Sequence, residues 1–325
     1  MKALFLGNVA ADTANGIIDR LPPDLNVEIL GDPQQLMRSP GAAADADILV
    51  TNHWRAEYPT APRVKLVQSV ATGIELIDLA ALPPRVTVCN AFGHETAIAE
   101  YILMVMLVWS HRFREIEGDF RLRSSWQPSW VQSGAPHGEI LGSTIGILGY
   151  GRIGREVARR AVGFGCRVIG ANRSPIADKG SASEIYPLAE LDRMLPQCDI
   201  VVIAAGLGPE TNRLIDARRL GLMQPTAFLI NIGRAGIVDE AALYAALKDN
   251  QIGGAAIDVW WQYPTAAEPN RRGSQLPFHE LPNVIMTPHC SSATDGARER
   301  RFSTVAGNLD RYVRGEKLTN VVLTT

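Results

Sequence analysis

The sequence predicts an α/β fold that consists of two doubly wound parallel-sheet domains with a cleft between them. Strand-length apolar runs alternate with helical patterns along all 325 residues. Near the middle of the chain a glycine-rich turn joins one such strand to a helix. The chain is also longer than one hydrophobic core normally serves, and this length favours two domains.

The first hundred residues predict the smaller sheet. Its candidate strands are residues 2–6, 27–30, 48–51, 66–69 and 87–89, with helical stretches between them. Strands that are joined through helices pair in parallel. A long apolar helix over 97–113 and a loop with Trp, Ser and Pro over 124–136 follow.

The larger sheet is predicted from the second half of the chain. Its candidate strands are residues 144–148, 167–170, 200–204, 227–231, 254–258 and 284–286. The last helix, over 297–314, lies beyond these strands and is expected to return to the first domain. We therefore predict a discontinuous substrate domain, 1–96 with 291–325, and a dinucleotide-binding domain over 97–290.

The glycine-rich turn predicts the ligand of the second domain. Gly149, Gly151 and Gly154 have G-x-G-x-x-G spacing between the strand at 144–148 and a helix over 152–164. In such a turn the first glycine permits the bend, the second leaves room for a pyrophosphate, and the third allows close packing of helix on strand. Three glycines alone are a weak signal, but the strand at 167–170 completes a βαβ unit. The unit predicts a Rossmann-like dinucleotide site.

The residues at the end of the strand predicted over 167–170 indicate which dinucleotide is bound. NAD-selective sites usually have Asp or Glu here, whereas this chain has Asn172, followed by Arg173 and Ser174. A guanidinium and a hydroxyl suit a phosphate monoester, so the pattern favours NADP over NAD. Alternatively, Arg173 stacks on the adenine and Asn172 holds the ribose, which leaves NAD as the cofactor.

Composition argues for small-molecule partners. The chain is 46% hydrophobic and has a formal net charge of −2, so it has no overall charge excess that would suit nucleic acid or an anionic membrane. Cys89, Cys166, Cys198 and Cys290 are scattered, which predicts neither a zinc or other metal site nor a disulfide framework. The apolar stretches fit neither a signal peptide nor a membrane span. We expect a cytoplasmic protein.

Three chemically useful side chains follow predicted strands of the larger sheet. They are Arg234, Asp258 and His289. Arginine can bind a carboxylate and polarise a carbonyl, and histidine can transfer a proton near neutral pH. Each also has a structural interpretation: an ion pair of Arg234 with Asp239, a turn cap for Asp258, or a buried His289. Their shared position after strands favours a catalytic site.

These motifs resemble those of the D-isomer-specific 2-hydroxyacid dehydrogenases over nearly the whole chain. The matching segments are ILGYGRIG, FLINIGRAGIVDE, GGAAIDVW and LPNVIMTPH, in the family's order, with looser matches in VATGIELIDL and VCNAFGHETAIAEY. The resemblance implies an enzyme that transfers hydride between NAD(P) and a 2-oxo acid or D-2-hydroxy acid.

The resemblance also implies roles for individual residues. Arg234 would bind the substrate carboxylate and carbonyl, His289 would be the acid/base, and Asp258 would contact the nicotinamide carboxamide. Backbone amides around Thr72 and Gly73 would complete the carboxylate site. Beside the residues already named, the cofactor site would include Arg152, Ile153 and Ile232.

One position departs from the family pattern. Five residues after Asp258 the family usually has a glutamate that pairs with the histidine, whereas this chain has Tyr263. A phenol can hydrogen-bond imidazole but is uncharged at neutral pH, so we expect His289 to titrate lower than in a glutamate-bearing relative. Downstream, Glu268 is a candidate replacement, and Arg271 and Arg272 are candidate substrate contacts.

Two rival functions follow from the same resemblance. Formate dehydrogenases of this superfamily also lack the glutamate and need no proton transfer, and corepressor relatives are non-catalytic dinucleotide sensors. The presence of both Arg234 and His289 argues against a sensor. The segment SSWQPSW resembles a dimerising arm, from which we expect a homodimer.

Overall fold

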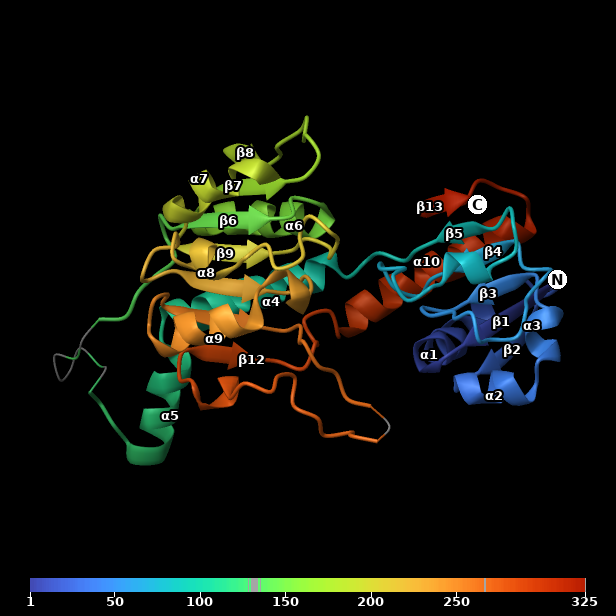
Figure 1. The fold of residues 1–325 in the computed structure, drawn as a ribbon, viewed down its shortest axis with the longest axis horizontal. Helices are drawn as coiled ribbons and strands as arrows, with labels where there is room; N and C mark the ends of the chain where they lie inside the picture. Colours follow the sequence, from blue (N-terminus) through green and yellow to red (C-terminus); the bar gives the residue numbers. More distant parts are fainter. Residues whose placement is uncertain (128, 130–133, 135, 266, 325) are drawn as a thin grey trace. The chain divides into compact units, whose positions relative to one another are not determined.

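The structure is a computed structural model that describes residues 1–127, 129, 134, 136–265 and 267–324. The chain forms two compact units (Figure 1). The first consists of Met1–His94 and Thr294–Thr325, and the second of Glu95–Ala293. The first unit is thus built from both ends of the chain, whereas the second is continuous.

The first unit contains a six-stranded sheet in the order β13-β5-β4-β3-β1-β2. All neighbours pair in parallel except β13, which is antiparallel to β5. The strands are β1 Lys2–Leu6, β2 Asn26–Leu30, β3 Ile48–Val50, β4 Leu66–Gln68, β5 Thr87–Cys89 and β13 Val321–Thr324. The helices are α1 Asn8–Ile17, α2 Pro33–Arg38, α3 Gly41–Ala44 and α10 Asp295–Val313.

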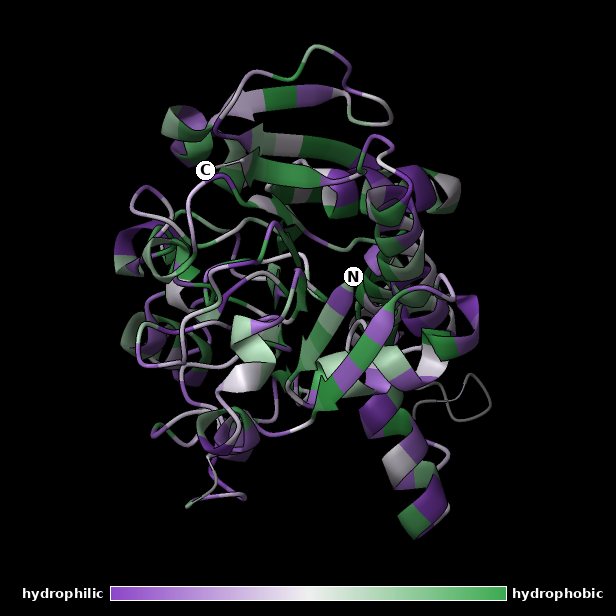
Figure 2. Cartoon of the chain, turned by 90° about the vertical axis from the view of Figure 1, so that its right-hand side faces the viewer, coloured by the Kyte–Doolittle hydropathy of each residue, from purple (hydrophilic) through white to green (hydrophobic). Residues whose placement is uncertain are grey.

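Both faces of this sheet are covered. On one face Phe5 and Ile48 belong to a buried cluster with Phe302 and Leu309 of α10. Leu49 of β3 belongs to the cluster on the other face. Because side chains alternate along a strand, a strand that is buried on both sides is apolar almost throughout, as β1 is from Ala3 to Leu6. In Figure 2 some strands are green along most of their length, whereas others also carry purple bands.

The second unit contains a seven-stranded parallel sheet in the order β12-β11-β10-β9-β6-β7-β8. The strands are β6 Thr144–Leu148, β7 Arg167–Asn172, β8 Glu184–Pro187, β9 Ile200–Ile203, β10 Phe228–Asn231, β11 Gly254–Ile257 and β12 Val284–Met286. Chain order reverses between β6 and β9, which is where doubly wound sheets open a ligand crevice.

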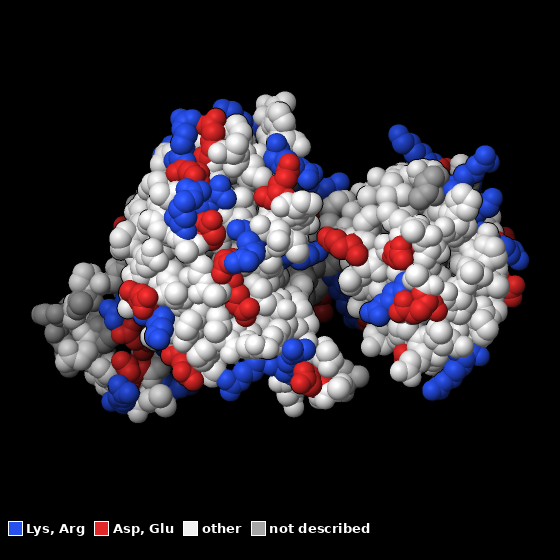
Figure 3. Space-filling model, viewed as in Figure 1, with Lys and Arg blue, Asp and Glu red and all other residues white. Residues whose placement is uncertain are grey.

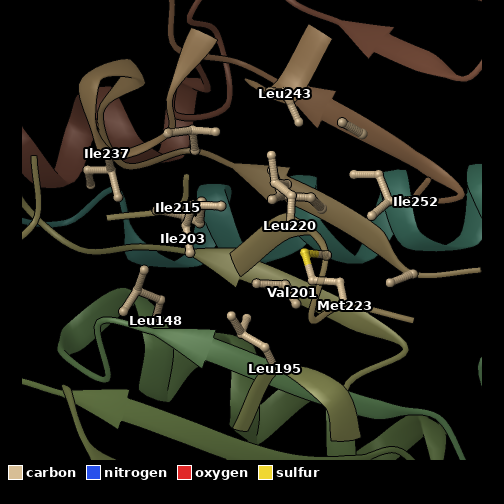
Figure 4. Packing of buried hydrophobic residues seen from close by; sticks show 14 of the residues in the cluster. Leu148, Leu195, Val201, Ile203, Ile215, Leu220, Met223, Ile237, Leu243 and Ile252 are labelled. Atoms are coloured by element: carbon tan, nitrogen blue, oxygen red, sulfur yellow. The ribbon is translucent and has the colours of Figure 1, made fainter. Parts of the chain in front are cut away.

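Helices cover both faces of this sheet. They are α4 Glu95–Ser110, α6 Arg152–Ala161, α7 Leu191–Met194, α8 Ala217–Leu220 and α9 Glu240–Lys248. The helix α5 Phe113–Arg123 buries none of its residues and projects away from the sheet (Figure 1). One face packs against α4 and α6, where Ile102 and Val157 are fully buried. The other face is shown in Figure 4, where Val201 and Ile203 of β9 pack beneath Leu220 and Leu243.

The predicted two-domain α/β fold is confirmed, and the differences concern individual elements. The helix predicted over 97–113 spans Glu95–Ser110, and Phe113 begins the next helix, α5. The sequence missed β8, which is short, and β13, whose side chains are largely exposed at the sheet edge. The predicted helix over 152–164 ends at Ala161 and continues as the 3₁₀ turn Val162–Phe164. In the segment SSWQPSW, Pro128 and Trp130 lie outside the described residues.

The described surface agrees with the charge balance of the sequence. On the face drawn in Figure 3, basic and acidic side chains are interspersed on both units. Within the described residues, no helix combines the length and the apolar character that a membrane crossing requires.

Candidate functional site

The candidate residues of the second unit gather at one edge of its sheet. The strands β10, β11 and β12 are neighbours and run in parallel, so their carboxyl ends lie along the same edge. Arg234, Asp258 and His289 follow these three strands in turn. Gly149 follows β6 in the same sheet. The fold therefore aligns all four loops along one edge.

The three glycines of the turn after β6 differ in the space around them. At Gly149, φ is +94° and a Cβ would lie 2.5 Å from the amide nitrogen of Ala205. At Gly154 a Cβ would lie 2.7 Å from the carbonyl oxygen of Gly149, so this glycine allows α6 to pack on the turn. A Cβ at Gly151 would meet nothing within 4 Å. Open space at the second glycine fits the approach of a pyrophosphate to the backbone.

A cavity of about 360 Å³ adjoins this turn. Its wall includes Gly149 and Gly151 on one side and the end of β7, Asn172 to Ser174, on the other. The loop from Ala204 to Thr211, after β9, completes it. The Asn172 side chain donates a 2.8 Å hydrogen bond to the Ser174 carbonyl and so shapes the end of the strand. Volume and lining fit the adenosine part of a dinucleotide.

Of the other predicted cofactor residues, Arg152 and Ile153 follow the glycine turn, and Ile232 follows β10. Arg152 is largely exposed at the start of α6, with a guanidinium nitrogen 4.0 Å from a Glu95 carboxylate oxygen. Ile153 follows it and is partly buried. Ile232, directly after β10, is buried.

Asp258 organises the loop that carries His289. Its side chain is fully buried and accepts hydrogen bonds from the Thr287 hydroxyl at 2.6 Å and from the Cys290 and Ser291 amides at 2.9 and 3.0 Å. His289 lies between these donors with φ +57°, a left-handed conformation that non-glycine residues rarely adopt. These bonds hold the histidine in place. The nicotinamide contact predicted for Asp258 stays a prediction.

A second layer of hydrogen bonds supports this loop. Tyr101 of α4 lies with its hydroxyl 2.6 Å from that of Thr287, and the Trp260 indole donates to the Thr287 carbonyl at 2.8 Å. Burial raises the pKa of Tyr101 to about 12, so its hydroxyl stays protonated. Since Thr287 donates to Asp258, Tyr101 donates to Thr287. Neither Tyr101 nor Thr287 was predicted as a site residue from the sequence.

Tyr263 takes the position next to the histidine. Its hydroxyl oxygen lies 2.8 Å from Nδ1 of His289, and the Trp260 amide points at the same oxygen from 3.4 Å. Glu268, the alternative candidate, forms an ion pair with Arg271 at 3.4 Å. The structure thus brings the phenol, and not this carboxylate, to the imidazole.

The surroundings of His289 favour its neutral form. Partial burial lowers its pKa, the Asp258 carboxylate raises it, and the Arg234 guanidinium lowers it, with a net downward shift. Burial raises the pKa of Tyr263 above its usual value, so Tyr263 is an uncharged phenol at neutral pH. Arg234 and Asp258 thus act in opposite directions on the pKa of His289.

Arg234 begins the short 3₁₀ turn Ala235–Ile237, and its guanidinium donates a 2.9 Å hydrogen bond to the Gly233 carbonyl. A Cβ at Gly233 would lie 2.6 Å from the Ala205 carbonyl oxygen, so the loops after β9 and β10 touch there. Asp239, the structural partner that the sequence offered for Arg234, pairs with Arg213 and caps α9.

Arg271 and Arg272 line a second cavity, of about 490 Å³, together with Tyr263 and Pro288. The Arg271 side chain donates to Gln262 at 3.0 Å, and Arg272 lies 2.6 Å from a ring nitrogen of His279. Their contacts with substrate stay predictions.

Thr72 and Gly73 belong to the first unit, in the loop after β4. The Thr72 hydroxyl donates to the Ala91 carbonyl at 3.1 Å and lies 3.2 Å from Nε2 of His94. The Asn90 side-chain amide donates to the Thr72 carbonyl at 2.8 Å. Sequence reasoning missed Asn90, although its place directly after β5 could have identified it. These bonds fix the loop that was predicted to bind the carboxylate.

Comparison with known proteins identifies a family. The family model "D-isomer specific 2-hydroxyacid dehydrogenase, NAD binding domain" matches residues 103–291. A glyoxylate reductase of Thermococcus gammatolerans is 37% identical over 319 residues, which cover 93% of this chain and 90% of the relative.

Solved structures agree with the observed fold. An NADPH-dependent glyoxylate/hydroxypyruvate reductase from Sinorhizobium meliloti, in complex with NADP and sulfate, is 25% identical with a TM-score of 0.79, and the match covers 99% of this chain and 97% of that one. An NAD-dependent formate dehydrogenase from Staphylococcus aureus, in complex with NAD, is also 25% identical, with a TM-score of 0.76 and all of both chains covered. The likeness therefore extends to proteins with different cofactors.

Proposed function

Since the chain belongs to the D-isomer-specific 2-hydroxyacid dehydrogenase family, we propose that it reduces a small 2-oxo acid such as glyoxylate or hydroxypyruvate, with NADPH as the preferred hydride donor. The observation that carries the proposal is the shared sheet edge. Arg234, Asp258 and His289 follow three neighbouring strands of the sheet that also bears the glycine turn.

The nicotinamide supplies a hydride to C2 of the oxo acid when it is bound. Arg234 donates parallel hydrogen bonds to the carboxylate and to the carbonyl oxygen, and these bonds strengthen as negative charge develops there. Protonated His289 then donates a proton from Nε2 to the same oxygen, which completes the 2-hydroxy acid. Tyr263 keeps the ring oriented through the 2.8 Å contact at Nδ1.

Further residues complete the proposed binding sites. The turn that Gly149, Gly151 and Gly154 form, with Arg152 and Ile153 at the start of α6, would hold the pyrophosphate, which would approach the backbone at Gly151. The remaining proposed contacts are Ile232 and Asp258 with the nicotinamide half of the cofactor, and the backbone amides of Thr72 and Gly73 with the substrate carboxylate.

Preference for NADPH is proposed from the end of β7. Asn172, Arg173 and Ser174 line the adenosine-sized cavity and present a guanidinium and a hydroxyl instead of a carboxylate at that strand end. A 2′-phosphate gains a charged partner from Arg173, whereas the 2′-hydroxyl of NADH does not. Arg173→Ala should therefore weaken NADPH binding much more than NADH binding.

Nicotinamide absorbance tests the proposed reaction. The protein is mixed with NADPH or NADH and with glyoxylate, hydroxypyruvate, pyruvate or phenylpyruvate, and formate with NADP or NAD is run in parallel. We expect turnover of at least one oxo acid. Turnover of formate alone would support the formate-dehydrogenase-like reaction, for which the absence of the family's glutamate is the supporting observation. Nucleotide binding without any turnover would indicate a sensor.

We also propose a homodimer that forms through α5 and the segment after it. Exposed apolar side chains gather there, with Phe120 and Trp126 in edge-to-face contact at 5.2 Å and Leu122 about 80% exposed. Exposed apolar side chains of this kind are stabilised when an interface covers them.

A further inference from the structure

The cavity beside the glycine turn has an acidic residue in its wall as well as a basic one. Glu210 lies in the loop after β9 and lines the same cavity as Arg173. The Arg173 guanidinium and the Glu210 carboxylate are 3.8 Å apart. Residues distant in sequence therefore form an ion pair at the wall of the cavity in which the adenosine ribose is proposed to lie.

The loop that carries Glu210 is held by its own hydrogen bonds. The Thr211 hydroxyl accepts from the Gly208 amide and donates to the Gly206 carbonyl, both at 2.8 Å. The Asn212 amide also donates to the Gly208 carbonyl at 2.9 Å. These bonds hold the backbone on either side of Glu210, and its side chain extends from there beside the cavity.

The Arg173 guanidinium has two possible anionic partners, the Glu210 carboxylate and a 2′-phosphate, which would compete for it. A nucleotide 2′-phosphate would have to displace Glu210 from the guanidinium, whereas an unphosphorylated ribose would leave the pair intact. Both side chains are mostly exposed, so the pair is weak and the competition is modest.

We propose that Glu210 is a specificity-determining residue that limits the preference of this enzyme for NADP(H), because it competes with the 2′-phosphate for Arg173. The inference rests on the proposed function, which assigns the cavity to the cofactor. Discrimination between NADP(H) and NAD(H) then depends on Arg173 and Glu210, which lie on two different loops, and not on the end of β7 alone.

The test measures binding without turnover. Dissociation constants for adenosine 2′,5′-bisphosphate, AMP, NADPH and NADH are determined by calorimetry for the wild type and for Glu210→Gln. We expect the variant to bind the bisphosphate and NADPH about fivefold more tightly, with AMP and NADH unchanged within about twofold. The gain should shrink at high salt, because the competing interaction is electrostatic.

Two further variants isolate the cause. Asp178→Asn removes the same charge from another exposed pair, with Arg155 at 3.5 Å, and Asp178 does not line the cavity. It should leave all four constants unchanged within about twofold. In an Arg173→Ala background, Glu210→Gln should lose its effect on the bisphosphate, because the competition acts through the guanidinium.

Several results would overturn the inference. Equal changes for phosphorylated and unphosphorylated ligands would mean that Glu210 does not discriminate between them. A full effect in the Arg173→Ala background would point to direct repulsion of the phosphate, and an equal effect of Asp178→Asn would point to overall charge. An absence of oxo-acid turnover in the wild type would reject the proposed function instead, and the adenosine ligands would still decide the role of Glu210.

Discussion

The residues around His289 set its pKa, and this pKa should determine the pH dependence of the proposed reaction. Partial burial and the Arg234 charge lower its pKa more than Asp258 raises it, and Tyr263 adds no charge. Reduction needs the protonated imidazole, so kcat/KM should fall as pH rises through this lowered pKa. The reverse reaction needs the neutral imidazole and is favoured above it.

Tyr263→Glu should move this limb of the pH profile upward by about one unit, which corresponds to ~1.4 kcal/mol of differential stabilisation of the imidazolium. An anion near Nδ1 favours the charged ring, and a phenol does not. The measurement is kcat/KM for oxo-acid reduction against pH, under conditions in which proton transfer limits the rate.

Tyr263→Gln provides the matched control, because glutamine has nearly the shape of glutamate without its charge. The limb should stay close to that of the wild type in this variant. If both variants shift equally, the change comes from the altered shape of the site. If neither shifts and the fold is intact, Tyr263 does not control the pKa of His289.

Arg234→Ala should lower kcat/KM by a hundredfold or more, about 3 kcal/mol, since the guanidinium is proposed to stabilise charge that develops in the transition state. Steady-state kinetics provide the measurement. Arg234→Lys keeps the charge but loses the bidentate fork, and should be intermediate. Turnover and KM within a few-fold of wild type in Arg234→Ala would make Arg234 a structural residue.

Substitutions in the glycine turn between β6 and α6 should distinguish a role in folding from a role in cofactor binding. Gly151→Ala should leave the free energy of unfolding unchanged within about 1 kcal/mol, because the new methyl group meets open space. It should weaken NADPH binding about tenfold or more, because the methyl group occupies space proposed for the pyrophosphate. Thermal unfolding and calorimetric titration measure the two effects.

Gly149→Ala is the comparison within the same turn. Its φ of +94° and the close backbone of Ala205 predict a loss of at least ~1–2 kcal/mol in the free energy of unfolding. A stable Gly149→Ala protein would contradict this account of the turn. Unchanged NADPH binding in Gly151→Ala would move the pyrophosphate elsewhere.

The exposed apolar side chains of α5 bear on the oligomeric state of the protein. Leu122→Glu should shift the protein from dimer to monomer in sedimentation experiments, because a charge would replace an apolar contact at the proposed interface. Phe164→Glu makes a similar change at another exposed apolar residue, after α6, and should leave the mass unchanged. A monomeric wild type would reject the dimer.

Elements that have a clear local pattern of apolar residues could be predicted from the sequence, and elements that depend on distant contacts could not. Strands such as Lys2–Leu6 and Thr144–Leu148 are buried on both faces, so their apolar runs indicated them at their observed bounds. The β-branched residues of β13 suit a strand, but its side chains are largely exposed, and its antiparallel pairing with the distant β5 is not visible in the local pattern.

The same limit applies to the candidate site. The places of Arg234, Asp258 and His289 after strands followed from the pattern of the chain. The left-handed conformation of His289 and the three donors on Asp258 depend on how the loop folds back, and the Arg173–Glu210 pair joins two loops. Such contacts arise from tertiary structure, which the spacing of residues does not encode.

The discontinuity of the first unit has a consequence during synthesis. The ribosome makes β1 to β5 first, but α10 and β13 only after the entire second unit, about 200 residues later. At roughly 5–20 residues per second, this interval is on the order of 10 to 40 seconds. Throughout it, the apolar face that receives Phe302 and Leu309 and the open edge of β5 lack their partners. The nascent chain thus presents an apolar surface and an unpaired strand edge to chaperones and to neighbouring chains until α10 and β13 emerge.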